Sequence, residues 1–331
     1  MKNGRMISFV VVLLACLTMG TEVRGADNFP TKPLELVVPY VAGGSTDVMV
    51  RTIVARALPF FNNQPVMVVN KPGGATVIGS RYVLDNRNDG YTLYSTSTAS
   101  MMIAPVINKT NFSWRDFIGV AQTMLGSDAL YVPGDAPYNT LEKFIDYAMQ
   151  NPGKIKYTTA GTGGSSHLPM EGFAVAKGLA IKHIPTKGDA ENIAALMGGH
   201  VTAGAGNPIA FQPHVASGKF KCLVQFGAER DKAFLPNIPT FKEFGIDVAV
   251  DLWRWVVVPK GVPPERVKFL AEAFKKIFQD KEVLASLEKI QCPASYLPPE
   301  DYEKAMKASE TSILPLIKAS KIMEARQKWP S

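Results

Sequence analysis

The sequence predicts an α/β protein of two domains, each with a mostly parallel sheet flanked by helices. Short β-branched runs alternate with apolar stripes at helical spacing, a pattern typical of parallel sheets covered by helices. The 331 residues exceed what one simple hydrophobic core supports. One loop rich in glycine and hydroxyl side chains also occurs in each half, at residues 37–47 and 157–167. Each loop runs from a predicted strand into a predicted helix.

In the N-terminal part, three strands and two helices are expected. Residues 34–38 form the first strand, and residues 66–69 form the second. A turn at 70–74 then leads into a short helix. Residues 92–94 form the third strand, followed by the polar loop 95–98. The helix after the first strand has its apolar residues on one face: Val50, Ile53, Val54, Ala57 and Leu58.

The rest of the chain continues this alternation. Strands are predicted at 155–158, 181–185 and 256–258. Asp189 is expected to cap a helix that Gly198 and Gly199 end. Two long helices follow, one starting after Pro264 and one over 301–323. Two helices of the middle part have apolar stripes, made of Leu141, Phe144, Ile145, Ala148 and Met149, and of Ile193, Leu196 and Met197.

Residues 1–26 predict an export signal. Lys2 and Arg5 precede an apolar run at 6–19 that is shorter than the roughly 20 residues of a membrane-spanning helix. Cleavage is expected after residue 25 or 26. An uncleaved anchor helix is the alternative, and Cys16 is a candidate for lipid attachment. In each case the mature protein leaves the cytosol.

The charge distribution argues against nucleic acid as a partner. The chain has a net charge of +7 at pH 7, of which the leader contributes about +2, and the basic residues are dispersed. A nucleic-acid site requires a basic stripe with aromatic residues, whereas mild positive charge helps attract anions. Outside the leader, Cys222 and Cys292 are the cysteines. Export permits a disulfide, and two buried thiols are the simpler interpretation.

The two glycine loops predict an anion site. A helix N-terminus has unpaired N–H groups and a partial positive charge. In open α/β sheets, ligands bind where strands end and loops enter helices. Because one loop comes from each half, the crevice between two domains is the expected site.

Metal, cofactor and nucleotide chemistry is not expected. The four histidines lack metal-ligand spacing, and no cysteine lies near one. The second loop lacks the ending of a P-loop, and no nucleophile elbow is present. Asp47 is a candidate catalytic base. The favoured interpretation is a structural one, in which its carboxylate ties down the first loop. His167 either faces a ligand or has a structural role, and the structural role is favoured.

Several motifs, spread over nearly the whole mature chain, resemble one protein family. Those of the N-terminal part are Val38-Pro39-Tyr40, Gly43–Val48, Asn70–Ala75 and Asp89–Leu93. The later ones are Gly161–Leu168, Ile184-Pro185 with Lys187-Gly188, Leu196–Val201, Glu229-Arg230, Pro236–Thr240, Glu243–Gly245 and Pro259–Pro263. Their order and spacing resemble the periplasmic solute-binding proteins of tripartite tricarboxylate transporters, the Bug or TctC-like family.

The resemblance implies a two-domain Venus flytrap fold that closes on a ligand. Domain 1 would comprise residues 27–128 and 227–331, and domain 2 residues 129–226. The ligand would be a small carboxylate, held through loop backbone groups and ordered water more than through an arginine. The implied partners are integral membrane transporter subunits, and the protein is expected to be a periplasmic monomer without a cofactor or a metal.

The ligand-binding residues implied by the resemblance lie in loops after strands. They are Tyr40, Val41, Ala42, Ser45, Thr46, Asp47, Ser97, Thr98, Gly163, Ser165, Ser166, His167, Thr186, Lys187, Gly188 and Asn207. The sequence departs from the family near them. Val41-Ala42 replaces a proline-containing loop, and Thr186 replaces a tyrosine. These departures leave the ligand open.

Two other functions remain open at this point. One is an exported hydrolase that uses Ser165 or Ser166 with Asp47 or His167, since a serine needs an activating base beside it. The other is a ligand sensor that presents its closed form to a signalling receptor.

Overall fold

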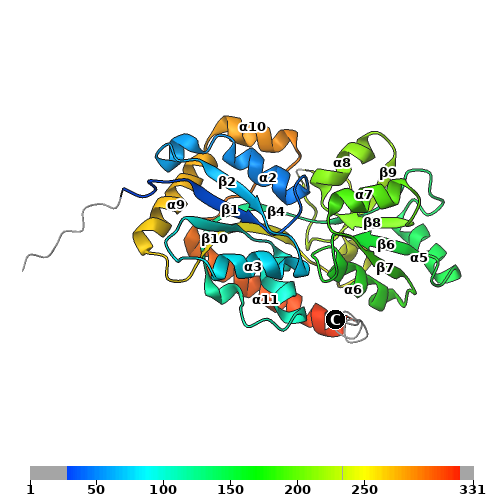
Figure 1. The fold of residues 1–331 in the computed structure, drawn as a ribbon. Coiled ribbons are helices and arrows are strands. Elements are labelled where there is room, and N and C mark those ends of the chain that lie inside the picture. The colour runs from blue at the N-terminus through cyan, green and yellow to red at the C-terminus, as the bar shows by residue number, and fades with distance from the viewer. Residues whose placement is uncertain (1–27, 233, 321–331) are drawn as a thin grey trace, which may run out of the picture.

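The computed structural model describes residues 28–232 and 234–320, which form two α/β lobes lying side by side (Figure 1). Each lobe is built on a five-stranded sheet. The predicted leader with Cys16, and the end of the last predicted helix, lie outside the described residues. Within the described part of the chain, no helix has the length and apolar character needed to cross a membrane.

Four strands of each sheet point in one direction and a fifth is reversed. In the first sheet the order is β2-β1-β3-β10-β4, and β10 is antiparallel to both neighbours. In the second it is β7-β6-β8-β5-β9, with β5 reversed. The predicted mostly parallel sheets are confirmed. The strands are β1 (Leu34–Val38), β2 (Val66–Asn70), β3 (Thr92–Ser95), β4 (Phe117–Gly126), β5 (Ala129–Pro133), β6 (Lys156–Thr159), β7 (Lys182–Pro185), β8 (Ala203–Gly206), β9 (Phe220–Gln225) and β10 (Leu252–Pro259).

Helices cover both faces of each sheet. On the first sheet, one face carries α2 (Ser45–Val54), α9 (Pro264–Ile277) and α10 (Lys281–Lys289), and the other α3 (Val77–Leu84), α4 (Ala104–Ile107) and α11 (Tyr302–Ala319). On the second sheet, one face carries α5 (Leu141–Gln150) and α6 (His167–Lys177), and the other α7 (Asp189–Met197) and α8 (Pro208–Ala216). The short helical turns are η1 (Leu58–Phe61), η2 (Gly74–Thr76), η3 (Ala99–Ile103), η4 (Trp114–Asp116), η5 (Phe241–Phe244) and η6 (Pro299–Asp301).

The strand pleat divides apolar side chains between two cores per sheet. Leu34, Leu36 and Val38 of β1 pack under α2 and α9, whereas Val37 packs on the opposite face. Successive strand residues point to opposite faces, so a strand covered on both sides is apolar throughout. The buried runs that identify β1 and β10 in the sequence therefore have a direct physical cause.

Three sequence-based expectations are wrong in detail. The first predicted helix ends at Val54, and Leu58 is 46% exposed in η1. Pro59 has no N–H with which to continue an α-helix, and it lies in the first turn of η1, a position that suits proline. Met149 and Met197, in the last turns of α5 and α7, are also exposed rather than part of a buried stripe.

Asp189 does not cap α7. Gly188 occupies the N-cap position and no side chain caps the helix there. The carboxylate of Asp189 is held instead by Ser45 of the first lobe, with 2.8 Å between oxygens. A contact from the other lobe thus replaces the local one that the sequence suggests.

The chain crosses between the lobes twice, and the two crossings lie side by side. The first occupies residues 127–128, between β4 and β5. The Oγ of Ser127 accepts hydrogen bonds from the N–H groups of Phe226 and Gly227. After β9, Phe241, Ile246 and Val248 still pack in the core of the second lobe. The domain limits at 128/129 and 226/227 stay predictions, and this packing favours a second limit nearer β10.

Cys222 and Cys292 are buried free thiols. They belong to the cores of different lobes. Burial raises the pKa of each to about 12. The simpler of the two interpretations of the cysteines is therefore confirmed.

Candidate functional site

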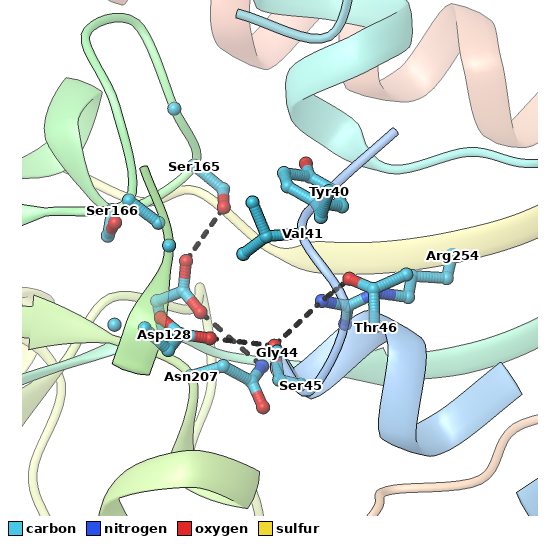
Figure 2. A pocket seen from close by; sticks show the side chains of 15 residues that line it. Tyr40, Val41, Gly44, Ser45, Thr46, Asp128, Ser165, Ser166, Asn207 and Arg254 are labelled. Carbon is cyan, nitrogen blue, oxygen red and sulfur yellow. Dashed lines mark hydrogen bonds between the residues drawn. The ribbon is translucent and has the colours of Figure 1, made fainter. Parts of the chain in front are cut away.

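A small cavity lies between the lobes where the two glycine loops meet (Figure 2). Its volume is about 50 Å³, room for a few water-sized groups. Figure 2 shows Arg254 and Thr46 on one side and Asp128, Ser165 and Ser166 on the other. The lining residues are Tyr40, Val41, Gly44, Ser45, Thr46, Asp128, Ala160, Gly164, Ser165, Ser166, Gly188, Asp189, Gly206, Asn207 and Arg254.

The first loop is fixed by Asp47 and directs the N-terminus of α2 at the cavity. One carboxylate oxygen of Asp47 accepts from the Gly43 N–H and from Arg51, each at 2.9 Å. The other accepts from Asn70 at 2.9 Å. Burial raises the pKa of Asp47, but these hydrogen bonds outweigh burial and hold the pKa below its usual value. The favoured structural interpretation of Asp47 is confirmed, and Ser45 and Thr46 are left facing the cavity.

The second loop is fixed by His167. Gly163 has a φ of +75°, and its N–H donates to Nδ1 of His167 at 3.0 Å. The His167 ring is buried and stacks on His183 with 3.8 Å between ring centroids. His167 therefore supports the loop from behind, and Ser165 and Ser166 face the cavity.

The two lobes approach each other closely around the cavity. Ser45 donates across it to Asp189. A Cβ on Gly188 would lie 3.0 Å from Cγ2 of Val41, and one on Gly163 only 2.7 Å from Cδ1 of Ile107. A side chain at either position would press on a side chain of the opposite lobe, so the two lobes are closely apposed here. The structure is thus a closed form of the clamp.

Arg254 is a buried cation with neutral partners. It comes from β10, is 4% exposed, and donates to Oγ1 of Thr46 at 2.8 and 3.0 Å and to Sδ of Met124 at 2.8 Å. Its remaining contact is a long one to Ser45. No carboxylate of residues 28–232 and 234–320 lies within 4 Å of it. A buried charge normally has a counter-charge, so this guanidinium is available to an anion in the cavity.

Two buried carboxylates face the same cavity. Oδ2 of Asp128 accepts from Ser165 at 2.7 Å, and Asn207 lies 3.4 Å from Oδ1. Burial, with a contribution from nearby Asp189, raises the pKa of Asp128 to about 6, although Ser165 and Arg254 oppose the rise. Burial also raises the pKa of Asp189, against hydrogen bonds from Ser45 and the charge of Arg254. Both acids are therefore easier to protonate than ordinary aspartates.

Half of the predicted site residues line this cavity and half do not. Those that line it are Tyr40, Val41, Ser45, Thr46, Ser165, Ser166, Gly188 and Asn207. Those that do not are Ala42, Asp47, Ser97, Thr98, Gly163, His167, Thr186 and Lys187. Ligand contact stays a prediction for the whole set.

The predicted site residues that do not line the cavity have other surroundings. Ser97 lies behind Tyr40, 2.9 Å from its hydroxyl. Thr98 bonds to the backbone of Asp251 and Trp253, near the second crossing. Thr186 donates to the backbone oxygens of Thr159, at the end of β6, and of Gly188 in its own loop. Ala42 and Lys187 are exposed.

The three charged residues of the cavity were missed as site residues. Arg254 sits in an apolar strand between two tryptophans, and Asp128 joins two largely apolar runs. Charged residues are almost never buried without a partner, so a charge inside a strand that is otherwise buried was the usable signal. For Asp189 no such signal exists, because an acid in the first turn of a helix is ordinary.

The cavity does not contain the arrangement expected of a serine hydrolase. Within the described residues, no hydrogen bond joins Ser165 or Ser166 to Asp47 or His167. Ser165 is bonded to Asp128 instead, and Nδ1 of His167 is occupied by Gly163. Nor do the described residues include a group of three or more histidine, cysteine or acidic side chains placed to hold a metal ion.

Comparisons with known proteins identify the family of the chain. The family model described as "Tripartite tricarboxylate transporter family receptor" matches residues 51–322. A Cupriavidus necator protein described as "UPF0065 protein in gbd 5'region" is 37% identical over 289 residues, covering 86% of each chain.

Two solved structures extend the comparison. A TctC solute-binding protein from Polaromonas, solved without ligand, is 31% identical, with a TM-score of 0.67 and coverage of 88% of this chain and 99% of that one. An R. palustris protein solved with adipate is 26% identical, with a TM-score of 0.77 and coverage of 89% and 98%.

Proposed function

Since the chain belongs to the tripartite tricarboxylate transporter receptor family, we propose that it captures a small organic acid between its lobes and delivers it to membrane transporter subunits. Proteins of this family are binding receptors, so the chain is a receptor and not an enzyme. Its periplasmic location follows from the same membership. The expected cleavage after residue 25 or 26, lipid at Cys16 and the monomeric state stay predictions.

The buried guanidinium of Arg254 carries the proposal. It faces a cavity lined by both lobes, beside the N-terminus of α2, and no carboxylate of the described residues lies within 4 Å of it. A helix N-terminus and a guanidinium both favour an anion. The adipate-bound relative supports a carboxylate as that anion.

Capture requires the lobes to open and close. The cavity is enclosed by residues of both lobes and is far smaller than the roughly 300–1,000 Å³ of ordinary ligand pockets. Two adjacent crossings, at 127–128 and after β9, provide the hinge on which such closure takes place. A ligand that contacts both lobes favours the closed form.

A thermal-shift screen of mono- and dicarboxylates, adipate included, tests the proposal, because a ligand of the native state raises the apparent stability. Ser165→Trp fills the cavity and is expected to abolish the shift, with the circular dichroism spectrum unchanged. Ser217→Trp, at an exposed position after α8, is the matched control and keeps the shift. Normal affinity in Ser165→Trp, or catalytic consumption of the ligand, contradicts the proposal.

A further inference from the structure

The charges inside the cavity specify the chemistry of the ligand more narrowly than membership of the family does. We infer that the ligand is a small zwitterion, whose carboxylate binds at Arg254 and whose ammonium group binds at Asp128 and Asp189. The inference rests on the proposed function, because it takes this cavity to be the ligand site.

The anionic end of the ligand is specified by Arg254. Its partners are a hydroxyl of Thr46, a thioether of Met124 and, at 3.5 Å, the hydroxyl of Ser45. None of these neutralises a guanidinium that is 4% exposed. A carboxylate forms short, charge-assisted bonds with a guanidinium. It would give Arg254 an ionic partner in direct contact, whereas Asp128 and Asp189 act on Arg254 only from farther away.

The cationic end is specified by the two aspartates. Asp128 is 4% exposed and Asp189 is 7% exposed. Their side-chain partners are neutral hydroxyl and amide groups, from Ser165 and Asn207 for Asp128 and from Ser45 for Asp189. Within the described ranges, no lysine, arginine or histidine nitrogen lies within 4 Å of either carboxylate. An ammonium group has three donors and a full positive charge, which suits a position beside two acids.

The balance of charge excludes a dicarboxylate as the preferred ligand. With both aspartates ionised, the three charged groups that line the cavity carry one net negative charge. One ligand carboxylate is matched by Arg254, but a second would lie against Asp128 or Asp189, where like charges repel. A zwitterion adds no net charge to the cavity, and each of its two charged groups lies beside residues of opposite charge. The volume of about 50 Å³ favours a ligand of few heavy atoms in this closed form.

The pH dependence distinguishes a zwitterion from a plain carboxylate. The titratable groups that face Asp128 are Asp189 on α7, Arg254 on β10, Tyr40 before α2 and Tyr131 on β5. The pKa of Asp128 is raised to about 6 by burial. A zwitterion needs the ionised acid, so its affinity falls about tenfold from pH 7 to pH 5. A plain carboxylate avoids repulsion when Asp128 is protonated, so its affinity does not fall.

Titration calorimetry with matched compounds tests the inference. Glycine, alanine, β-alanine and 4-aminobutyrate are each compared with the acid that lacks the amino group, namely acetate, propionate or butyrate, and with adipate. At pH 7 at least one amino acid is expected to bind tenfold or more tightly than its matched acid. In Asp128→Asn this ratio falls to about one. Asp146→Asn, at an exposed position on α5 of the second lobe, keeps the ratio.

The outcomes separate this inference from the proposed function. If the plain acids or adipate bind as tightly as the amino acids, the zwitterion is wrong and the receptor function stands. If no compound of either set binds, both are wrong. If Asp128→Asn folds and keeps the wild-type ratio, the assignment to Asp128 fails. Should that variant not fold, the wild-type pH profiles decide, and parallel profiles for both classes of compound overturn the inference.

Discussion

Asp128→Asn is expected to stabilise the ligand-free protein at neutral pH. The carboxyl group is 4% exposed, accepts a hydrogen bond from Ser165 and has no cationic partner within 4 Å in the part of the chain that the structure describes. Its pKa is raised from 3.8 to about 6, chiefly by burial. The ionised form is therefore disfavoured in the folded state, and a neutral amide of the same shape removes this cost.

The size of the effect follows from the shift in pKa. A group whose folded pKa lies above its unfolded pKa binds protons more tightly when folded, so stability is highest at low pH and is lost as pH rises toward the folded pKa. A shift from 3.8 to about 6 corresponds to about 3 kcal/mol at pH 7.5 and to about 0.6 kcal/mol at pH 4. The amide can still accept from Ser165, and only the 3.4 Å contact with Asn207 is lost, at about 1 kcal/mol. The expected net gain at pH 7.5 is about 2 kcal/mol.

Urea unfolding of wild type and Asp128→Asn at pH 4 and at pH 7.5 measures the free energy of unfolding of each protein. The difference in free energy of unfolding between the two proteins should change by about 2.4 kcal/mol from pH 4 to pH 7.5. Asp146→Asn, whose side chain is exposed, provides the baseline and should show little change. A difference that is the same at both pH values would refute the argument, because the buried charge would then carry no cost.

Two further predictions concern the contact between the lobes. Ser45→Ala removes the hydrogen bond to Asp189, so small-angle scattering of the ligand-free protein should show a larger radius of gyration than wild type. An unchanged radius would mean that other contacts suffice for closure. Gly163→Ala places a methyl group 2.7 Å from Ile107, at a φ of +75°. It should lower the free energy of unfolding by about 1–3 kcal/mol in urea titrations, and a neutral effect would show that the loop can withdraw from Ile107.

Local patterns predicted the fold well because they have local causes. Val37 and its neighbours are all apolar because β1 is covered on both faces, so the strand is visible in the sequence. β4 was not predicted, since glutamine and threonine interrupt its apolar residues and become buried only through contacts with distant segments. Gln122, for example, donates to Ser295 near the C-terminus.

The same distinction applies to the site. The glycine loops are local signals, since a strand, a turn and a helix N-terminus follow one another in sequence. Asp128, Asp189 and Arg254 come from distant parts of the sequence and are brought together only by the arrangement of the two lobes. Ser45 and Asp189 are separated by 144 residues and meet at 2.8 Å. No spacing rule detects such a pair, and the sequence consequently predicted the loops that line the cavity better than the charged residues inside it.

The cost of these buried charges links ligand binding to closure. In the closed form without ligand, Arg254 has neutral partners and both aspartates are disfavoured as anions. In the open form proposed above, water would reach these groups and the cost would fall. A ligand with matching charges removes the same cost while the lobes stay closed. It therefore stabilises the closed form both through its own contacts and by neutralising the buried charges. Coupling of this kind is reciprocal, and any variant that relieves the buried charge, such as Asp128→Asn, should favour closure while weakening recognition of the ligand.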